Sequence, residues 1–309
     1  RRPPRSTLFP YTTLFRSAAP ATGGATLAPI VVTGRPLART PGQSAYATSL
    51  LDAGRLAAGA SLRLEEALRD VPGFQQFRRL DSRSANPSTQ GVTLRGLGGN
   101  ASARALVLLD GVPVGDPFAG WIPYSALPPE RLALARVTRG GGAGPFGSGA
   151  VAGTIELESA TRDERTPAQA RILGGSRDSL EAALALTPAV GGGFASLDAR
   201  FDRGDGYVLI PEEQRGPVDI PAEYQAWSVA GRLVAPLGER LEAQLRIAGF
   251  RDERVRGLPG ADNLAAGQDA SLRLLLRGDW QAEVIAYVQG RNFATVARSA
   301  DALRQTATT

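Results

Sequence analysis

Two nearby stretches, GVTLRG at Gly91–Gly96 and ALVLLDGVP at Ala105–Pro113, hold the pattern that decides the fold of the first half of the chain. The apolar runs Val92–Leu94 and Ala105–Leu109 have the length and composition of short strands. Asp110-Gly111 follows the second run directly, and this dipeptide favours the positive φ angles of a tight hairpin turn. We therefore predict two strands and a hairpin in this part of the chain.

The flanking residues extend these strands into a small domain. A short helix is predicted upstream, capped by Ser61 and ended by Pro72-Gly73, from the spacing of the apolar residues Leu62, Leu64, Ala67 and Leu68. Downstream, Val151–Leu157 is predicted to be the last strand, after the glycine-rich run 140–149. That run lacks the Lys-Ser/Thr ending of a phosphate loop and precedes a strand, so no nucleotide site is predicted. Residues 45–160 are thus expected to form one α+β domain.

Four motifs in this region, in order, resemble the plug domain of TonB-dependent receptors. They are the two stretches above, LRDVPG at Leu68–Gly73, and the run from Arg139 to Leu157 that contains GSGAVAGTIEL. The chain departs from the family at Leu134–Val137, where an Arg-hydrophobic-Glu-Val run is usual, and at Gly141, where Pro is usual. The resemblance covers residues 30–160 and implies a plug that folds inside the lumen of an outer-membrane β-barrel.

After residue 160 apolar and polar residues alternate. Within Arg240–Gly249 one face holds Leu241, Leu245 and Ile247, and the other holds Glu242, Gln244 and Arg246. Segment 281–291 alternates in the same way, and five others do so less cleanly, at 168–173, 179–187, 194–202, 224–235 and 269–277. Alternation over about 10 residues is typical of a membrane barrel strand. We predict about seven antiparallel strands in residues 161–309, with Leu241, Leu245 and Ile247 facing lipid.

The connections between these segments alternate in length. They are short near 188–192, 236–239 and 277–280, and long near 203–222 and 253–267. Outer-membrane barrels combine short periplasmic turns with long external loops, whereas a soluble β-sandwich, the alternative, does not require long loops all at one end. The predicted fold class is an α+β plug domain followed by antiparallel β strands of an incomplete transmembrane β-barrel. Because the chain contains no Met, we expect it to be a piece of a longer protein.

The composition excludes several classes of function. The chain has no Cys or His, which removes thiolate and imidazole metal ligands and the usual nucleophile–base pairs. Its net charge of +5 falls to about +1 without Arg1, Arg2, Arg5 and Arg16, and the remaining Arg residues form no stripe, so no nucleic-acid partner is predicted. No apolar stretch reaches the ~18 residues of a membrane helix. We predict neither an enzyme nor a bound cofactor or metal ion.

The N-terminal residues divide into two parts. Residues 1–17 (RRPPRSTLFPYTTLFRS) repeat TLF and resemble translated sequencing-adapter read-through, so we interpret them as a non-native leader. Residues 18–44 are predicted to be a flexible linker. Its β-branched patch resembles the TonB box of the family and consists of Ile30, Val31, Val32, Thr33 and Gly34. The resemblance implies capture by the partner protein TonB through strand addition; the alternative is a first plug strand without a special role.

The resemblance further implies energised import of a scarce ligand, of the ferric siderophore, haem or cobalamin class, across the cell outer membrane. Two plug loops are expected to contact this ligand through Arg83, Asn86, Ser88, Gln90, Phe118, Trp121 and Tyr124. The alternative for Trp121 and Tyr124 is packing against the barrel wall. Pairing with barrel carboxylates is expected at Arg95, Arg136 and Arg139, with ordinary surface charge as the alternative. The alternative function is a non-transport β-rich binding or adhesion protein of the cell envelope.

Overall fold

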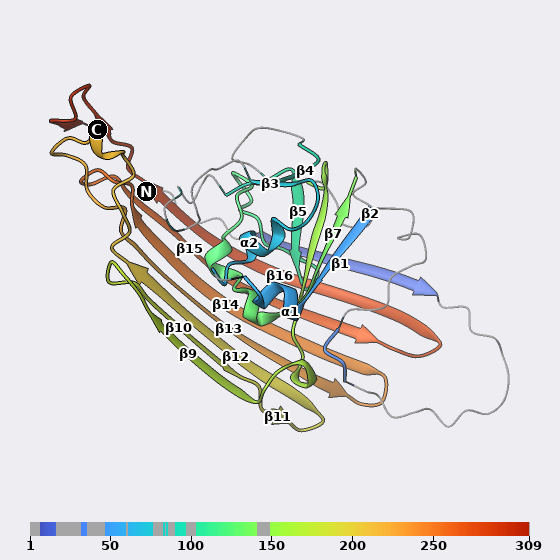
Figure 1. The fold of residues 1–309 in the computed structure, drawn as a ribbon. Helices are drawn as coiled ribbons and strands as arrows, with labels where there is room; N and C mark the ends of the chain where they lie inside the picture. The colour runs from blue at the N-terminus through green and yellow to red at the C-terminus, as the bar shows by residue number, and fades with distance from the viewer. Residues whose placement is uncertain are drawn as a thin grey trace.

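Seven strands follow one another through the second half of the chain, each antiparallel to the next. They are β9 (Ala168–Gly174), β10 (Leu180–Leu186), β12 (Gly193–Gly204), β13 (Tyr224–Leu237), β14 (Leu241–Val255), β15 (Asp262–Leu276) and β16 (Trp280–Thr295). A short strand, β11 (Ala189–Val190), pairs with β12. The sheet is open and curves beside a smaller domain (Figure 1). The seven predicted strands are confirmed.

The computed structural model describes residues 7–16, 32–35, 47–59, 61–76, 83, 85, 90–96, 103–140 and 149–308. In the first of these ranges, β1 (Thr7–Arg16) pairs antiparallel with β16. The segment that we interpret as a non-native leader thus adds a strand to the large sheet. The edge of an open sheet offers unpaired N–H and C=O groups to any extended segment, so this pairing requires no particular sequence.

Two strands are longer than the alternation predicts. β14 runs to Val255 and β15 begins at Asp262, so the loop predicted at 253–267 is reduced to residues 256–261. The prediction was wrong because charged side chains occupy both faces at the end of β14. These side chains form two ion pairs, Arg251 with Glu253 and Arg254 with Asp252.

The smaller domain contains a five-stranded mixed sheet. Its order is β2 (Ala47–Asp52), β7 (Leu132–Arg139), β8 (Gly153–Ser159), β5 (Ala105–Leu109) and β6 (Val112–Pro113), with β5 parallel to β8. A separate pair joins β3 (Phe74–Gln76) to β4 (Val92–Leu94). The strands predicted at 92–94 and 105–109 are confirmed, and the last strand begins two residues later than predicted.

Short helices connect these strands. They are α1 (Ala53–Ala57), α2 (Leu64–Leu68) and the 3-10 turns η3 (Tyr124–Ala126) and η4 (Pro129–Arg131). The predicted helix is α2, but its N-cap is Arg63 and not Ser61. The pattern does not predict α1, which Asp52 caps by accepting the N–H of Arg55 at 2.9 Å. In the part of the chain that the structure describes, no helix is long and apolar enough to cross a membrane.

The turn at Asp110-Gly111 has the predicted conformation. Its φ angles are 47° and 78°, and Leu109 pairs with Val112 across it. The turn also touches the large sheet: a Cβ on Gly111 would lie 2.9 Å from Nη2 of Arg273 and 3.0 Å from Cδ1 of Ile285. The backbone conformation therefore favours glycine here, and the ends of two side chains of the large sheet lie close to it.

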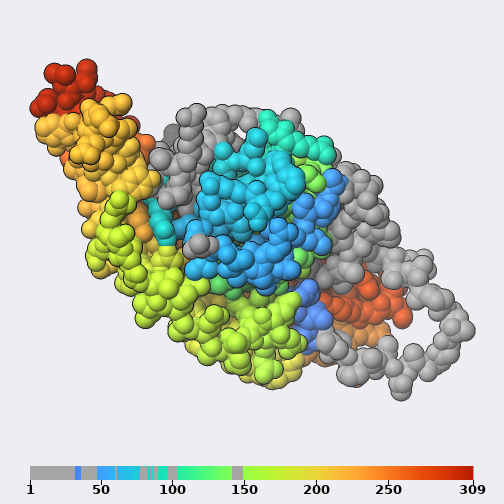
Figure 2. Space-filling view, in the orientation of Figure 1, coloured from blue at the N-terminus to red at the C-terminus, as the bar shows by residue number. Residues whose placement is uncertain are grey.

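The large sheet has an inner face, which contacts the smaller domain, and an outer face turned away from it. On β14 the inner residues Glu242 and Gln244 are 0% and 5% exposed, whereas the outer residues Leu245 and Ile247 are 40% and 59% exposed. Figure 2 shows the smaller domain, in blue, lying over the sheet. The predicted facing of these four residues is confirmed. This arrangement, polar inside and apolar outside, is the reverse of a soluble sandwich and matches a membrane barrel.

The two ends of the large sheet differ. One end has the connections 187–192, 238–240 and 277–279, and the other has the connections 175–179 and 256–261 and the long connection 205–223. These are hereafter the short-turn end and the long-loop end. The predicted long connection is thus confirmed at 205–223, whereas 256–261 is no longer than 187–192 at the other end.

Candidate functional site

Residues 32–35 lie against the inner face of the large sheet at the short-turn end. The Thr33 N–H donates to Oε2 of Glu242 at 3.2 Å. Arg277 donates to the Thr33 hydroxyl oxygen and to the Arg35 carbonyl, both at 3.0 Å. Glu242 and Arg277 pair with each other at 2.7 Å. Side chains of the sheet therefore hold this segment largely through its backbone.

Gly34 completes this attachment. Its φ of +65° and the Phe194 ring, 3.0 Å from where a Cβ would lie, both favour glycine. Its carbonyl accepts a hydrogen bond from Arg232. Of the predicted TonB box, Val32, Thr33 and Gly34 lie here, and Ile30 and Val31 lie outside the described residues.

Ion pairs join the smaller domain to the inner face. Arg200 of β12 pairs with Glu130 of η4 at 2.9 Å and with Glu181 of β10 at 3.1 Å. Two Arg residues of the smaller domain pair with sheet carboxylates, Arg83 with Glu181 and Arg63 with Asp202. Arg83, predicted as a ligand contact, is thus part of the contact between the domain and the sheet.

The three Arg residues predicted to pair with barrel carboxylates form no ion pair with the described part of the large sheet. Arg136 lies 3.8 Å from Glu158, and Arg139 donates to the Pro72 carbonyl at 3.1 Å, both within the smaller domain. Arg95 is exposed, at a φ of 59°, with no ion pair among the described residues. The pairing of β7 with β8 explains the difference at Arg136, because it places Glu158 diagonally across from that side chain.

Arg131 is a buried cation of this interface that the sequence pattern does not single out. Its Nη2 donates to the Ser228 carbonyl at 2.9 Å and to the Ser228 hydroxyl at 3.1 Å. Beside it, Arg165 pairs with Asp198 at 2.9 Å. Burial lowers the pKa of Arg131 to about 10. The positive charges of Arg246 and Arg165 also lower this pKa, whereas the negative charge of Asp198 raises it.

Trp121 packs the smaller domain against the sheet. It is 2% exposed and clusters with Phe250 and Ala265, and its ring centroid lies 5.9 Å from that of Phe293. Tyr124 is buried in the core of the smaller domain. The burial of Trp121 supports the alternative, packing between domain and wall, and the ligand contact of these two side chains stays a prediction. For Tyr124 the packing is within the domain.

Phe118, in the same loop, is 76% exposed. The Asp116 carboxylate accepts the N–H groups of Phe118 at 2.9 Å and Ala119 at 2.8 Å, and the Asp116 N–H donates to the Trp121 carbonyl at 2.8 Å. This closed turn presents an aromatic side chain to the surroundings. Phe118 therefore stays a predicted ligand contact.

The other predicted ligand residues do not join Phe118. Gln90 is buried, and its backbone carbonyl accepts the N–H of Ile122 at 3.2 Å. Asn86 and Ser88 lie outside the described residues. Within the described ranges, no three carboxylate, His or Cys side chains gather as a metal site.

A groove of about 570 Å³ crosses the sheet at the long-loop end. One row of paired residues lines it, Tyr224, Arg254, Asn263 and Thr295. The guanidinium of Arg83 lies 5.7 Å from the centre of the Tyr224 ring, so the smaller domain borders the groove. This row is visible only once the register of four strands is known, which is why the sequence pattern does not reveal it.

The arrangement of a small domain against an inward-polar sheet has clear relatives. The TonB-dependent Receptor Plug Domain family matches residues 40–154. A mutant of the ferric enterobactin receptor PfeA from Pseudomonas aeruginosa is 16% identical, with a TM-score of 0.59 over 80% of this chain and 40% of that chain. The siderophore receptor PirA from Acinetobacter baumannii is 14% identical, with a TM-score of 0.63 over 84% and 42%. The copper transporter OprC is 21% identical, with a TM-score of 0.61 over 83% and 39%.

No curated protein matches the chain. The chain spans about two fifths of the length of the solved structures that it resembles. At these identities the structural likeness concerns the fold, and the family match identifies the smaller domain. Residues 40–154 therefore match the TonB-dependent receptor plug domain, and the open antiparallel sheet that follows has the fold of part of the barrel of these solved receptors.

Proposed function

We propose that the complete receptor imports a scarce ligand across the cell outer membrane with energy supplied by TonB. The ligand is of the ferric siderophore, haem or cobalamin class, and the receptor moves it without chemical change. PfeA and PirA are siderophore receptors, which favours the first class. The chain has no His, Cys or Met, the side chains that suit copper best, which disfavours a copper site in this part of the receptor.

The docking of residues 32–35 carries this proposal. Thr33 and Arg35 are held by hydrogen bonds to Glu242 and Arg277 of the barrel wall. Such bonds exchange with water at little net cost, so the segment can detach while the apolar core of the plug stays intact. The N–H that an added TonB strand could use, that of Thr33, is the one that Glu242 occupies. TonB therefore competes with the barrel wall for this segment.

The outer face supports a place in the outer membrane. Trp227 and Trp280 are exposed on this face, the first toward the long-loop end and the second at the short-turn end. Trp is enriched at both interfaces of a membrane. Between Leu237 and Trp227 a strand rises roughly 33 Å, or about 23 Å across a bilayer at the usual tilt, close to the ~25 Å apolar band of outer-membrane barrels.

The long-loop end supports entry of the ligand from outside. The groove beside Tyr224 and Arg254 is wide enough for a small molecule, and its lining mixes aromatic, charged and amide groups. Phe118 adds an exposed aromatic side chain from the plug. We propose Phe118 and this groove as ligand contacts, in place of Trp121 and Tyr124.

The test uses cells that produce the full-length receptor and three labelled probes, ferric enterobactin, haemin and cobalamin. Binding is measured on intact cells, and accumulation is measured with and without a protonophore and in a strain that lacks TonB. The proposal expects one probe to bind in every case and to accumulate only in energised cells that contain TonB. Binding without accumulation of any probe would favour the envelope binding protein instead.

A further inference from the structure

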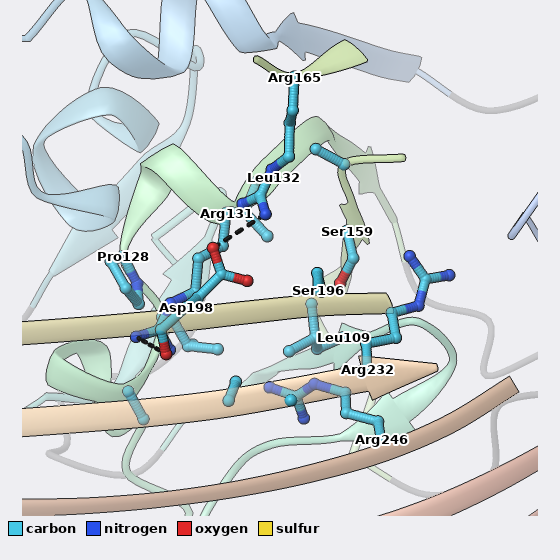
Figure 3. A pocket seen from close by; sticks show the side chains of 15 residues that line it. Leu109, Pro128, Arg131, Leu132, Ser159, Arg165, Ser196, Asp198, Arg232 and Arg246 are labelled. Carbon is cyan, nitrogen blue, oxygen red and sulfur yellow. Dashed lines mark hydrogen bonds and ion pairs between the residues drawn. The ribbon is translucent and has the colours of Figure 1, made fainter. Parts of the chain in front are cut away.

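A small, partly enclosed cavity lies between the plug and the barrel wall (Figure 3). Its volume is about 20 Å³. The plug lines it with Arg131, Leu132 and Ser159, and the wall lines it with Asp198, Arg232 and Arg246, among others. Arg165, from the segment that joins plug to barrel, also lines it. Four guanidinium groups thus surround this cavity with one carboxylate, a clear excess of positive charge.

Two of these cations oppose each other directly. Arg232 of β13 is the cross-strand partner of Arg246 of β14, and both belong to the inner face of the sheet. Like charges in directly opposite positions destabilise a sheet. Inside a protein, where the dielectric is lower than in water, the repulsion is stronger. The pair therefore needs a counter-charge.

The protein itself does not supply that counter-charge in full. Nη1 of Arg232 is buried and has no hydrogen-bond partner, and Arg246 has no ion pair or hydrogen bond, within the part of the chain that the structure describes. Neighbouring inner Arg residues are different, because each has a carboxylate partner: Arg254 with Asp252, Arg273 with Glu283, and Arg291 with Asp269. The Arg232–Arg246 pair is thus unlike its neighbours.

The nearby carboxylates are already engaged. Asp198 is paired with Arg165 at 2.9 Å. Asp110 accepts the N–H of Ser159 at 2.9 Å and its hydroxyl at 2.5 Å, and its single charge is shared between Arg232 and Arg273. Glu242 is engaged by Arg277 at 2.7 Å. Arg232 is buried and Arg246 half-buried, and these shared carboxylates leave an excess of positive charge around the cavity, which favours an added anion.

We propose that this cavity is a binding site for a small monatomic anion, chloride under physiological conditions, held between Arg232, Arg246 and the plug. The volume admits one water-sized particle, which excludes phosphate and the carboxylates of a siderophore. Arg232 and Arg246 of the wall and Arg131 of the plug line it (Figure 3). The anion links β13 and β14 to the plug. This inference is independent of the imported ligand.

The direct test is diffraction from the full-length receptor crystallised with bromide in place of chloride. An anomalous peak at hydrogen-bonding distance from both Arg232 and Arg246 is the expected result. Absence of the peak, with the cavity empty or holding only water, would overturn the proposal.

Thermal unfolding gives a second, independent measurement. Chloride in place of gluconate, at constant ionic strength, should raise the Tm saturably, by about 1–4 °C for each tenfold increase above the Kd. Arg246→Gln removes one of the two facing charges, so the variant should match the parent in gluconate and lose the response to chloride.

Arg251→Gln is the matched control on the same strand. Arg251 is exposed and pairs with Glu253 at 2.6 Å, away from the cavity. This variant should keep the full response to chloride. An equal Tm in chloride and gluconate for the parent, or a response that survives Arg246→Gln, would contradict the site.

Discussion

The ring of Trp121 lies against the ring of Phe293, with 5.9 Å between the centroids and 49° between the planes. Trp121 belongs to the plug and Phe293 to β16, so this contact joins the plug to the barrel wall by apolar packing. Around it the interface is ionic, as Arg200 with Glu130 illustrates. Apolar packing and ion pairs therefore both hold the plug against the barrel wall, and the two kinds of contact respond differently to substitution and to pH.

Trp121→Ala should destabilise the attachment of the plug. Replacing a buried Trp by Ala typically costs about 3–5 kcal/mol, and Trp121 is 2% exposed. Thermal unfolding of the full-length receptor measures this loss, and ligand affinity at a temperature where the plug is folded should be unchanged. Phe118→Ala is the control: it should leave the Tm unchanged and weaken ligand binding by roughly 1 kcal/mol or more. A Trp121 variant that kept its Tm and lost affinity would restore the ligand role of that residue.

Gly111→Ala should weaken the docking of the plug hairpin. Its φ of 78° is unfavourable for Ala, and the new Cβ would lie 2.9 Å from Arg273. Gly238→Ala isolates the first effect, because Gly238 has a φ of 81° and no atom within 4 Å of the position of a Cβ. We expect the Gly111 variant to lose roughly 1 kcal/mol or more beyond the Gly238 variant in chemical denaturation. Equal losses would show that the contact with Arg273 contributes nothing.

Asp110 should make plug stability depend on acid pH. Burial alone would raise the pKa of Asp110, but the charges of Arg232 and Arg273 and the hydrogen bonds from Ser159 outweigh it and lower the pKa. The stabilisation of the folded state by ionised Asp110 is therefore complete above the pKa of the unfolded state, about 3.9. It is lost as the pH falls through the lower pKa of the folded state. The Asp110→Asn variant should have a lower Tm than the parent at neutral pH, and its Tm should fall less steeply below pH ~3.9. If the Tm of the variant fell as steeply in acid as that of the parent, Asp110 would not be the source of the pH dependence.

Leu245→Arg tests the lipid-facing surface. An Arg near the middle of the apolar band should cost about 2–4 kcal/mol, falling to about 0–1 kcal/mol near an interface. Val255→Arg places the same charge at the long-loop end of the same strand. Folding of the full-length receptor into lipid vesicles, followed by denaturant titration, compares the two. Similar costs at both positions would contradict the membrane band.

Local patterns in the sequence are enough to predict much of the fold. The period of two predicts the facing of Leu245 and Gln244, and a β-turn dipeptide predicts the conformation at Asp110-Gly111. Both features depend on neighbours in the chain, so the sequence alone predicts them. The sequence does not predict the boundaries of β14, because the alternation is lost where charges occupy both faces.

The candidate site depends on contacts between residues distant in the chain, which the sequence pattern does not reveal. An exposed and a buried aromatic, Phe118 and Trp121, stand three positions apart in one loop, and only the position of the barrel wall separates their roles. Alternation alone also suggests that Gln244→Arg is mild. Gln244 instead bonds to Arg232 at 3.2 Å and to Glu242 at 2.7 Å, so we expect that change to be costly.

Energy coupling through residues 30–34 is tested most directly by Val32→Pro in the full-length receptor. Pro removes a backbone donor and fixes φ, which prevents an extended segment from pairing with an added strand. Ala25→Pro, in the preceding linker, is the control and should import the labelled probe normally. For Val32→Pro we predict that cells bind the probe as tightly as with the parent receptor but no longer accumulate it. Accumulation at the parental rate would contradict the proposal that TonB acts on this segment.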